Sequence, residues 1–324
     1  MTEVVIHIGT PKTGTTAIQQ ALSENEELLD RESIWFSKVG RHRAAHNDLA
    51  NAILRHGKAH RFYDKFFEEF DKIMASQKYR MVLLSSEIFS LIRPNRVLQC
   101  LPILSDKPLK IIVYFRRQDQ YVEAFYKQRL KNGRTVIPFS EFLESRVCER
   151  ITDYNGLLKG WSESFPAAVI VPRVYQRINF TDGDIVSDFF ELLSVNLSSL
   201  SRSDVERNLS PSRDVIDILL ALSAHFKGSD LRKIFRKAKG QNLPGFSAKE
   251  DLFTLAERQL YCAKFDQTNK TFHQTYFPQK PELFSPPAQA SRDQRAMLFE
   301  ADRNRPVLLT ALLKAAFDLK AEKN

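Results

Sequence analysis

Short apolar runs in this chain alternate with longer segments in which apolar residues recur at helical spacing. The runs are typical of buried strands, and the helical spacing predicts amphipathic helices between them. Strands that alternate with helices favour a parallel α/β sheet. The predicted strands are Val4–Gly9, Tyr79–Ser85, Leu109–Phe115 and Ala167–Val171.

After about residue 182 the pattern becomes helical. We expect one domain over residues 1–324, with a core of about residues 1–210 and a helical C-terminal part of about residues 211–324. The predicted helices are Ala44–Arg55, Arg61–Ser76, Arg96–Leu104, Gln118–Lys131, Tyr154–Phe165, Asp184–Leu193, Asp214–Phe226 and Arg305–Leu319.

A loop bounded by Gly9 and Gly14 joins the first predicted strand to an amphipathic helix that Thr15 and Thr16 open. Backbone N–H groups at the start of such a helix, together with the helix dipole, favour a bound anion. The sequence therefore predicts a phosphate cradle. It also predicts the fold that carries one, an α/β fold with a P-loop-type parallel β-sheet flanked by helices and a helical C-terminal extension.

The position of the lysine separates this loop from that of nucleoside-triphosphate hydrolases. Their pattern places a lysine directly after the second glycine, where it reaches the β- and γ-phosphates. Here Thr15 stands at that position, and Lys12 lies inside the loop. The loop is therefore expected to hold a shorter and differently placed anion.

Composition adds a preference for anionic partners. The chain has 324 residues and a net charge of +9, which suits a nucleotide, an acidic glycan, nucleic acid or a membrane surface. No nucleic-acid motif accompanies the charge. The three cysteines lie far apart and form no disulfide or metal-binding pattern. The chain contains no run long enough to span a membrane and no recognisable leader, so a cytoplasmic location is expected.

Polar residues follow each predicted strand. Glu87 comes shortly after the second strand, Arg116 and Arg117 follow the third, and Arg173 and Tyr175 follow the fourth. Ligands of parallel sheets bind at the carboxyl ends of the strands, so we expect these side chains to meet at one cleft. The forked guanidinium of arginine is well suited to a phosphate group.

With these residues the chain resembles the sulfotransferases that use 3′-phosphoadenosine 5′-phosphosulfate, most of all bacterial sulfotransferase-family proteins. The family's 5′-phosphosulfate loop matches Pro11-Lys12-Thr13-Gly14-Thr15-Thr16, and its 3′-phosphate arginine matches Arg116. The family's serine, eight residues later, is replaced by Ala124. The resemblance extends over roughly the first two thirds of the chain.

The resemblance implies transfer of a sulfuryl group from 3′-phosphoadenosine 5′-phosphosulfate to a hydroxyl or amine. A carbohydrate or glycolipid is the expected acceptor, and no metal is expected. Lys12 would neutralise charge on the departing phosphate oxygen, and the backbone of residues 13–16 would hold the 5′-phosphate. Arg117, Lys127 and Arg129 are candidates to compensate for Ala124. No nucleic-acid partner or membrane span is expected, and the oligomeric state is left open.

A base must take the acceptor's proton, and Glu87 is the first candidate. His46, near a predicted helix start, is the alternative, because an unperturbed imidazole suits proton transfer near neutral pH. Arg207 could close over the 3′-phosphate. An equally weighted alternative is that the segment has a structural role only, in which Ser210 caps the helix that follows. Two other functions stay open: a P-loop kinase or other nucleoside-triphosphate enzyme, and a degenerate nucleotide-binding protein.

Overall fold

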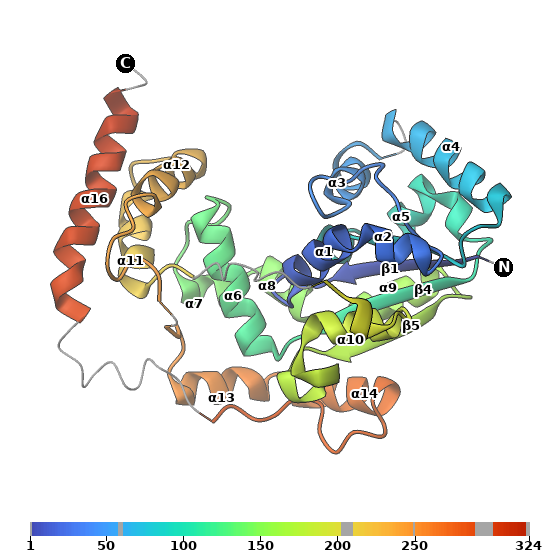
Figure 1. Ribbon diagram of the computed structural model, residues 1–324. Helices are drawn as coiled ribbons and strands as arrows, with labels where there is room; N and C mark the ends of the chain where they lie inside the picture. Colours follow the sequence, from blue (N-terminus) through green and yellow to red (C-terminus); the bar gives the residue numbers. More distant parts are fainter. Residues whose placement is uncertain (1, 58–60, 202–209, 249, 289–300, 322–324) are drawn as a thin grey trace. The chain divides into compact units, whose positions relative to one another are not determined.

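The computed structural model describes residues 2–57, 61–201, 210–248, 250–288 and 301–321 (Figure 1). The chain divides into two compact units, each built from separate stretches. Unit 1 comprises residues 1–117, 153–206 and 272–284, and unit 2 comprises residues 118–152, 207–271 and 285–324. Residues 118–152 thus group with the C-terminal helices, and the expectation of one domain with a core of about residues 1–210 stays a prediction.

Unit 1 is built on a five-stranded sheet in which every pair of neighbouring strands is parallel (Figure 1). The strand order is β2-β3-β1-β4-β5. This confirms the predicted α/β class with a parallel sheet flanked by helices. The strands are β1 (Glu3–Gly9), β2 (Ile34–Phe36), β3 (Met81–Ser85), β4 (Leu109–Phe115) and β5 (Val169–Val174).

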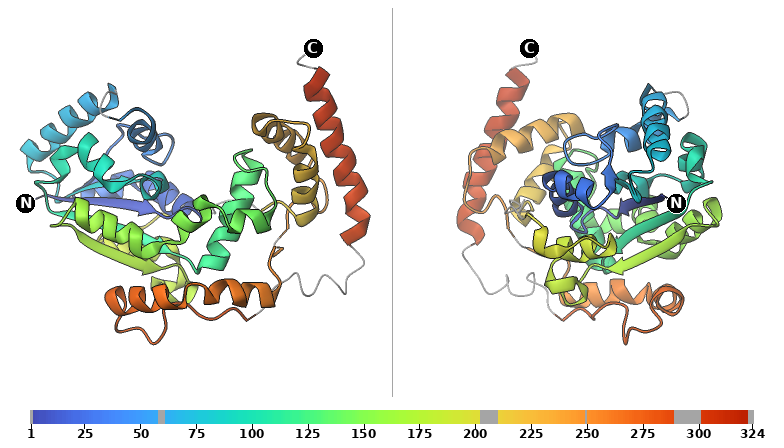
Figure 2. Two further views of the ribbon diagram at one scale, coloured as in Figure 1. Left: turned by 180° about the vertical axis from the view of Figure 1, so that it is seen from behind. Right: turned by 45° about the vertical axis from the view of Figure 1, so that its right-hand side comes forward.

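The strand order explains how the helices are distributed over the two faces of the sheet. Parallel crossovers are right-handed, so connections that run in opposite directions along the sheet lie on opposite faces. Across the sheet, the connection from β1 to β2 runs in the opposite direction to the connections from β2 to β3, from β3 to β4 and from β4 to β5. Helices α1 and α2 therefore lie on one face of the sheet, and α3, α4, α5 and α9 lie on the other (Figure 2). These helices are α1 (Thr15–Glu24), α2 (Glu26–Arg31), α3 (Asn47–His56), α4 (Arg61–Ser76), α5 (Pro94–Cys100) and α9 (Tyr154–Ser164).

A buried cluster joins the sheet to α1, α2 and α10 (Ile185–Leu192). Within it the Tyr114 hydroxyl donates to the Asp188 carboxylate at 2.6 Å, and the guanidinium of Arg173 forms an ion pair with the same carboxylate. Arg173 therefore holds β5 to α10. The sequence grouped Arg173 with the cleft, but its charge is already balanced by a side chain that is fully buried.

Unit 2 is helical in the part that the structure describes. The long C-terminal helix packs against α11 and α12, and its buried side chains include Leu308, Leu312 and Leu319. None of the helices described has both the length and the apolar character needed to cross a membrane. The helices are α6 (Gln118–Lys131), α7 (Phe139–Leu143), α8 (Arg146–Thr152), α11 (Arg213–Leu222), α12 (Gly228–Lys239), α13 (Leu255–Ala263) and α16 (Ala301–Ala321), and α14 (Asp266–Tyr276) crosses between the units.

A histidine of strand β1 lies within the core of unit 1. His7 in β1 is fully buried; its Nδ1 lies 2.8 Å from Ser85 Oγ, and its ring centroid lies 4.9 Å from that of Phe189. Burial lowers the pKa of His7 to about 3, because a charged imidazolium would lose its hydration there. His7 is therefore neutral in the folded protein even at mildly acidic pH.

Unit 1 should lose stability through His7 as the pH falls from about 6.5 to about 3. Between these pH values, His7 binds a proton in the unfolded chain but not in the folded protein. Its contribution to the free energy of unfolding is therefore fully present above pH 6.5 and is lost as the pH falls towards 3. The free energy of unfolding should fall by about 1.4 kcal/mol per pH unit from this residue. In the His7→Leu variant the dependence should be shallower by that amount.

Urea unfolding followed by tryptophan fluorescence reports on unit 1, because both tryptophans of the chain, Trp35 and Trp161, belong to it. The control is His42→Leu, at a side chain that is 65% exposed, which should keep the wild-type slope. Equal slopes for wild type and His7→Leu would contradict the assignment.

Candidate functional site

The loop between β1 and α1 starts at a glycine that has no room for a side chain. Gly9 has φ of 92°, and a Cβ atom there would lie 2.8 Å from both the Cα and the Cβ of Glu87. Only glycine tolerates this backbone and this distance. The close approach sets Glu87, at the start of the 3₁₀ turn Glu87–Leu91, directly against the loop.

The loop ends at a second glycine that precedes α1. Gly14 has φ of 74°, and a Cβ atom there would lie 3.1 Å from Tyr175 and 3.1 Å from Ile185. Its carbonyl accepts the N–H groups of Ala17 and Ile18, at 2.9 and 3.2 Å. The N–H groups of residues 15 and 16 precede these first intrahelical bonds. Such groups at a helix start point away from the helix and can donate to an anion.

Two threonines hold the loop in shape. The Thr13 hydroxyl, which is fully buried, donates to the Thr10 carbonyl at 2.5 Å. The Thr10 hydroxyl in turn donates to the Tyr114 carbonyl of β4 at 3.0 Å. Thr15 is also buried, whereas Thr16 is exposed. Among the predicted phosphate-binding threonines, the Thr16 hydroxyl is therefore the one that solvent reaches freely.

Lys12 and Arg116 are neighbours across the loop. Lys12 has φ of 68° and is partly exposed, as is Pro11 before it. The Lys12 carbonyl accepts a hydrogen bond from Arg116 Nη1 at 3.5 Å. The Arg116 guanidinium also lies 5.8 Å from the centre of the Tyr175 ring. The backbone thus brings two cationic residues from β4 and the β1–α1 loop to one place.

Arg116 is also held through its backbone, because its carbonyl accepts the Tyr154 hydroxyl of α9 at 2.5 Å. Its neighbour Arg117 is only 8% exposed. The two arginines at the end of β4 therefore differ in their access to solvent, since Arg116 is partly exposed. Arg116 is the better placed of the two to contact a ligand at the loop.

The Glu87 carboxylate is held by α1. Glu87 Oε2 accepts a hydrogen bond from Gln19 Nε2 at 3.1 Å. The capping role at this turn belongs to Ser86, whose hydroxyl accepts from the N–H of Ile88 at 3.2 Å. Glu87 is thus partly buried beside the loop and oriented by Gln19, and it is not needed as the cap.

His46 is in a different situation. It is fully buried, its Nδ1 accepts from the N–H of Ser85 at 3.1 Å, and its Nε2 lies 3.0 Å from the Ser37 carbonyl. Burial and the nearby Arg41 charge lower the pKa of His46 to about 3. With both ring nitrogens bound to backbone groups, the geometry speaks against His46 as a base.

The remaining predicted positions lie in unit 2 or outside the described residues. Arg207 lies outside the described residues. Ala124 lies on α6 in unit 2 and is partly exposed. Lys127, a candidate to replace the missing hydroxyl, forms an ion pair with Glu123 at 2.6 Å, with both side chains 7% exposed. The charge of Lys127 is therefore balanced by a carboxylate of unit 2.

Sequence reasoning missed Gln19 and placed Tyr175 only among general cleft residues. Nothing in the sequence marks Gln19, since its role depends on the spacing of α1 from β3. Tyr175 follows β5 directly and packs over both Gly14 and Arg116. Across the described residues, no group of three or more His, Cys, Asp or Glu side chains could hold a metal ion.

No protein-family model matches the chain. An uncharacterized protein from Archaeoglobus fulgidus is 28% identical over 204 residues, which is 62% of this chain and 55% of that protein. The chain thus spans about half the length of the curated relative that it matches. A solved structure, the sulfotransferase from Alicyclobacillus acidocaldarius, aligns with 15% identity and a TM-score of 0.41, covering 63% of this chain and 85% of that one.

Proposed function

We propose that the protein is a sulfotransferase. It would move a sulfuryl group from 3′-phosphoadenosine 5′-phosphosulfate to a hydroxyl or amine of an acceptor, with a carbohydrate or glycolipid as the expected class. The observation that carries the proposal is the position of Lys12. This lysine lies inside a glycine-bounded loop, next to Arg116, and the residue directly after Gly14 is a threonine and not a lysine.

Two features of the loop support binding of a 5′-phosphosulfate. The start of α1 offers backbone N–H groups next to Gly14, which has no side chain to obstruct a phosphate. Lys12 supplies a positive charge that can neutralise the bridging oxygen as the bond to sulfur breaks. Arg116 adds a second cation, suited to the 3′-phosphate.

Glu87 is the proposed base. As the acceptor oxygen forms its bond to sulfur, the acceptor's proton passes to the Glu87 carboxylate, and adenosine 3′,5′-bisphosphate leaves. The hydrogen bond from Gln19 orients the carboxylate. Most of the acceleration is expected from in-line positioning and charge stabilisation, as in phosphoryl transfer.

Two observations define the alternatives. A P-loop kinase needs a lysine after Gly14 for the β- and γ-phosphates, and Thr15 stands there instead. A degenerate nucleotide-binding protein is favoured by Ala124, which lacks the hydroxyl of the family's serine, and by the commitment of Lys127 to Glu123. The nucleotide that binds separates these cases.

Calorimetric titration with adenosine 3′,5′-bisphosphate in the absence of metal, compared with ATP and Mg²⁺, tests the proposal. We expect the bisphosphate to bind in the micromolar range and ATP not to bind. Arg116→Ala should lower the affinity for the bisphosphate by about ten- to hundredfold, because it removes a hydrogen bond to a charged group. The affinity for AMP, which has no 3′-phosphate, should change little.

Arg55→Ala, at an exposed position on α3, is the matched control and should bind like wild type. Binding of ATP with Mg²⁺ alone would favour a kinase, and binding of neither nucleotide would favour a degenerate site. Equal weakening of the bisphosphate and AMP would remove Arg116 from the 3′-phosphate site.

Lys12→Ala should nearly abolish transfer, with a loss of about a hundredfold or more, because it removes the charge that stabilises the departing phosphate. Chromatography can follow the release of adenosine 3′,5′-bisphosphate from 3′-phosphoadenosine 5′-phosphosulfate with a panel of simple sugars as acceptors. Lys12→Arg, which keeps the charge in a different shape, should retain part of the activity. Near-normal turnover of Lys12→Ala would overturn the mechanism.

Glu87→Gln should lower turnover by about a hundredfold or more while the affinity for adenosine 3′,5′-bisphosphate stays the same, because only proton transfer is lost. The amide has the size of the carboxylate and can still accept from Gln19. A turnover within a few-fold of wild type would place the base elsewhere. A selective loss of turnover in His46→Ala, with unchanged nucleotide affinity, would reassign it.

A further inference from the structure

Unit 2 contains a pocket of about 440 Å³ with walls from α6, α7, α11 and α13. This volume falls within the range of sites for small organic ligands. All the residues that line it belong to unit 2, and none belongs to the phosphate loop or to the residues that contact it. The pocket therefore shares no residue with the phosphate loop of the proposed function.

Aromatic rings form a continuous wall of this pocket. Ring centroids are 5.0 Å apart for Tyr126 and Phe139, 4.9 Å for Phe139 and Phe253, and 5.3 Å for Phe253 and Tyr261. Leu260, next to Tyr261, also lines the pocket and is 72% exposed. An exposed leucine at the edge of an aromatic wall offers apolar surface that an apolar ligand would cover.

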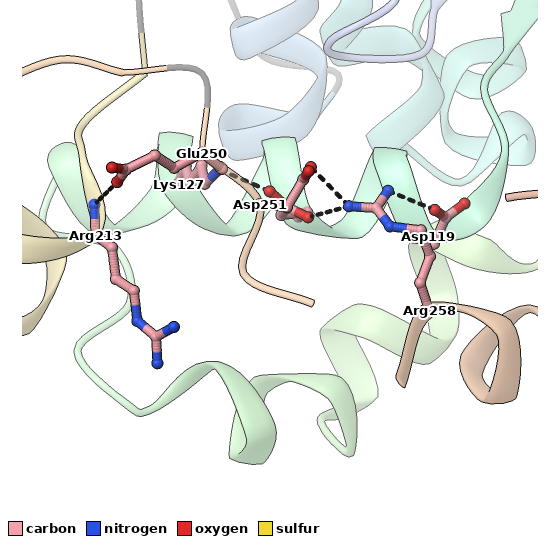
Figure 3. Close-up of polar contacts among 7 residues, drawn as sticks. Asp119, Lys127, Arg213, Glu250, Asp251 and Arg258 are labelled. Carbon is pink, nitrogen blue, oxygen red and sulfur yellow. Dashed lines mark hydrogen bonds and ion pairs between the residues drawn. The ribbon is translucent and has the colours of Figure 1, made fainter. Parts of the chain in front are cut away.

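Buried ion pairs fix the wall. Arg258, with a side chain only 4% exposed, donates to Asp119 at 2.7 Å and to Asp251 at 2.7 Å (Figure 3). It also donates to Glu123 at 3.1 Å. Asp119 and Glu123 lie on α6, so Arg258 joins α13 and the segment at Asp251 to that helix. Phe253 lies two residues after Asp251, and the centre of its ring is 5.7 Å from the Arg258 guanidinium.

The same network positions a positive charge in the pocket. Lys127 on α6 bonds to the Glu250 carbonyl, and the Glu250 carboxylate accepts the backbone N–H of Arg213 at 2.7 Å. The Arg213 side chain extends away from that carboxylate (Figure 3), and Arg213 lines the pocket. Glu250 therefore fixes the start of α11 and leaves the guanidinium available to a ligand.

The other charged residues of the lining are engaged in contacts of their own. Glu257 closes a capping box with Thr254, and Lys264 forms an ion pair with Glu144 at 3.2 Å. Burial and the nearby Asp217 carboxylate raise the pKa of Tyr126, so its hydroxyl stays neutral. Asp217 lies one helical turn beyond Arg213 and also lines the pocket. Its negative charge would repel a second negative charge on a ligand, so the pocket favours a monoanion bound at Arg213 over a dianion.

We propose that this pocket binds an amphipathic monoanion, with an alkyl chain or ring against the aromatic wall and a single carboxylate or sulfate at Arg213. The apolar part would cover Leu260 and the rings, and the guanidinium would bind the head group through two parallel hydrogen bonds. The proposal does not depend on the sulfotransferase assignment, since it uses no residue of the phosphate loop.

Isothermal titration of the full chain with octanoate and with octanamide tests it. The two probes share a chain and differ in head-group charge. Octanoate should bind about tenfold or more tightly than octanamide, because a hydrogen bond to a charged group is worth more than one between neutral groups. Arg213→Gln should lower the affinity for octanoate to that for octanamide and leave octanamide unchanged.

Leu260→Asp should weaken the binding of both probes. Leu260 is exposed, so the variant should fold like wild type, which circular dichroism can check. Arg232→Gln, at an exposed position on α12, is the matched control and should bind both probes like wild type. The proposal is overturned if neither probe binds, if both bind equally well to wild type, or if Arg213→Gln binds octanoate unchanged.

Discussion

The candidate site depends on two glycines at which the β1–α1 loop packs closely against its neighbours. At Gly9 the loop lies against the backbone of Glu87, and at Gly14 it lies against Tyr175 and Ile185. Both glycines also have positive φ, so any other residue would be strained as well as crowded. These two contacts fix the path of the loop, and with it the direction of the helix-start N–H groups, the place of Lys12 and the nearness of Glu87.

How far the sequence could predict this structure depends on how local the determining contacts are. The loop and α1 follow from contiguous residues, and the long apolar runs correctly placed β1, β3 and β4. The short strand β2 has three residues, too few for a periodic pattern. The last strand was placed at Ala167–Val171 but covers Val169–Val174, because Pro172 and Arg173 interrupt its apolar run. A proline is tolerated there since β5 lies at the edge of the sheet.

The residues whose surroundings the sequence could not show are those whose partners lie far away along the chain. His46 resembles an available imidazole until Ser37 and Ser85 occupy its two nitrogens. Arg258 and Asp119 are 139 residues apart, and nothing in the sequence indicates that they form a pair. Their burial appears only when α13 packs on α6, and that packing also explains why residues 118–152 group with the C-terminal helices.

The net charge of +9 illustrates the difference between overall charge and positioned charge. Several of the exposed positive charges lie on a single helix, α12: Arg232, Lys233, Arg236, Lys237 and Lys239. Exposed charges are screened within about 10 Å at ordinary ionic strength, so they can steer anions without selecting among them. Selection requires a cation held at a defined distance from the ligand. In the proposed sulfotransferase site that cation is Lys12, and its position before Gly14 rather than after it is the reason for proposing a phosphosulfate and not a triphosphate as the ligand.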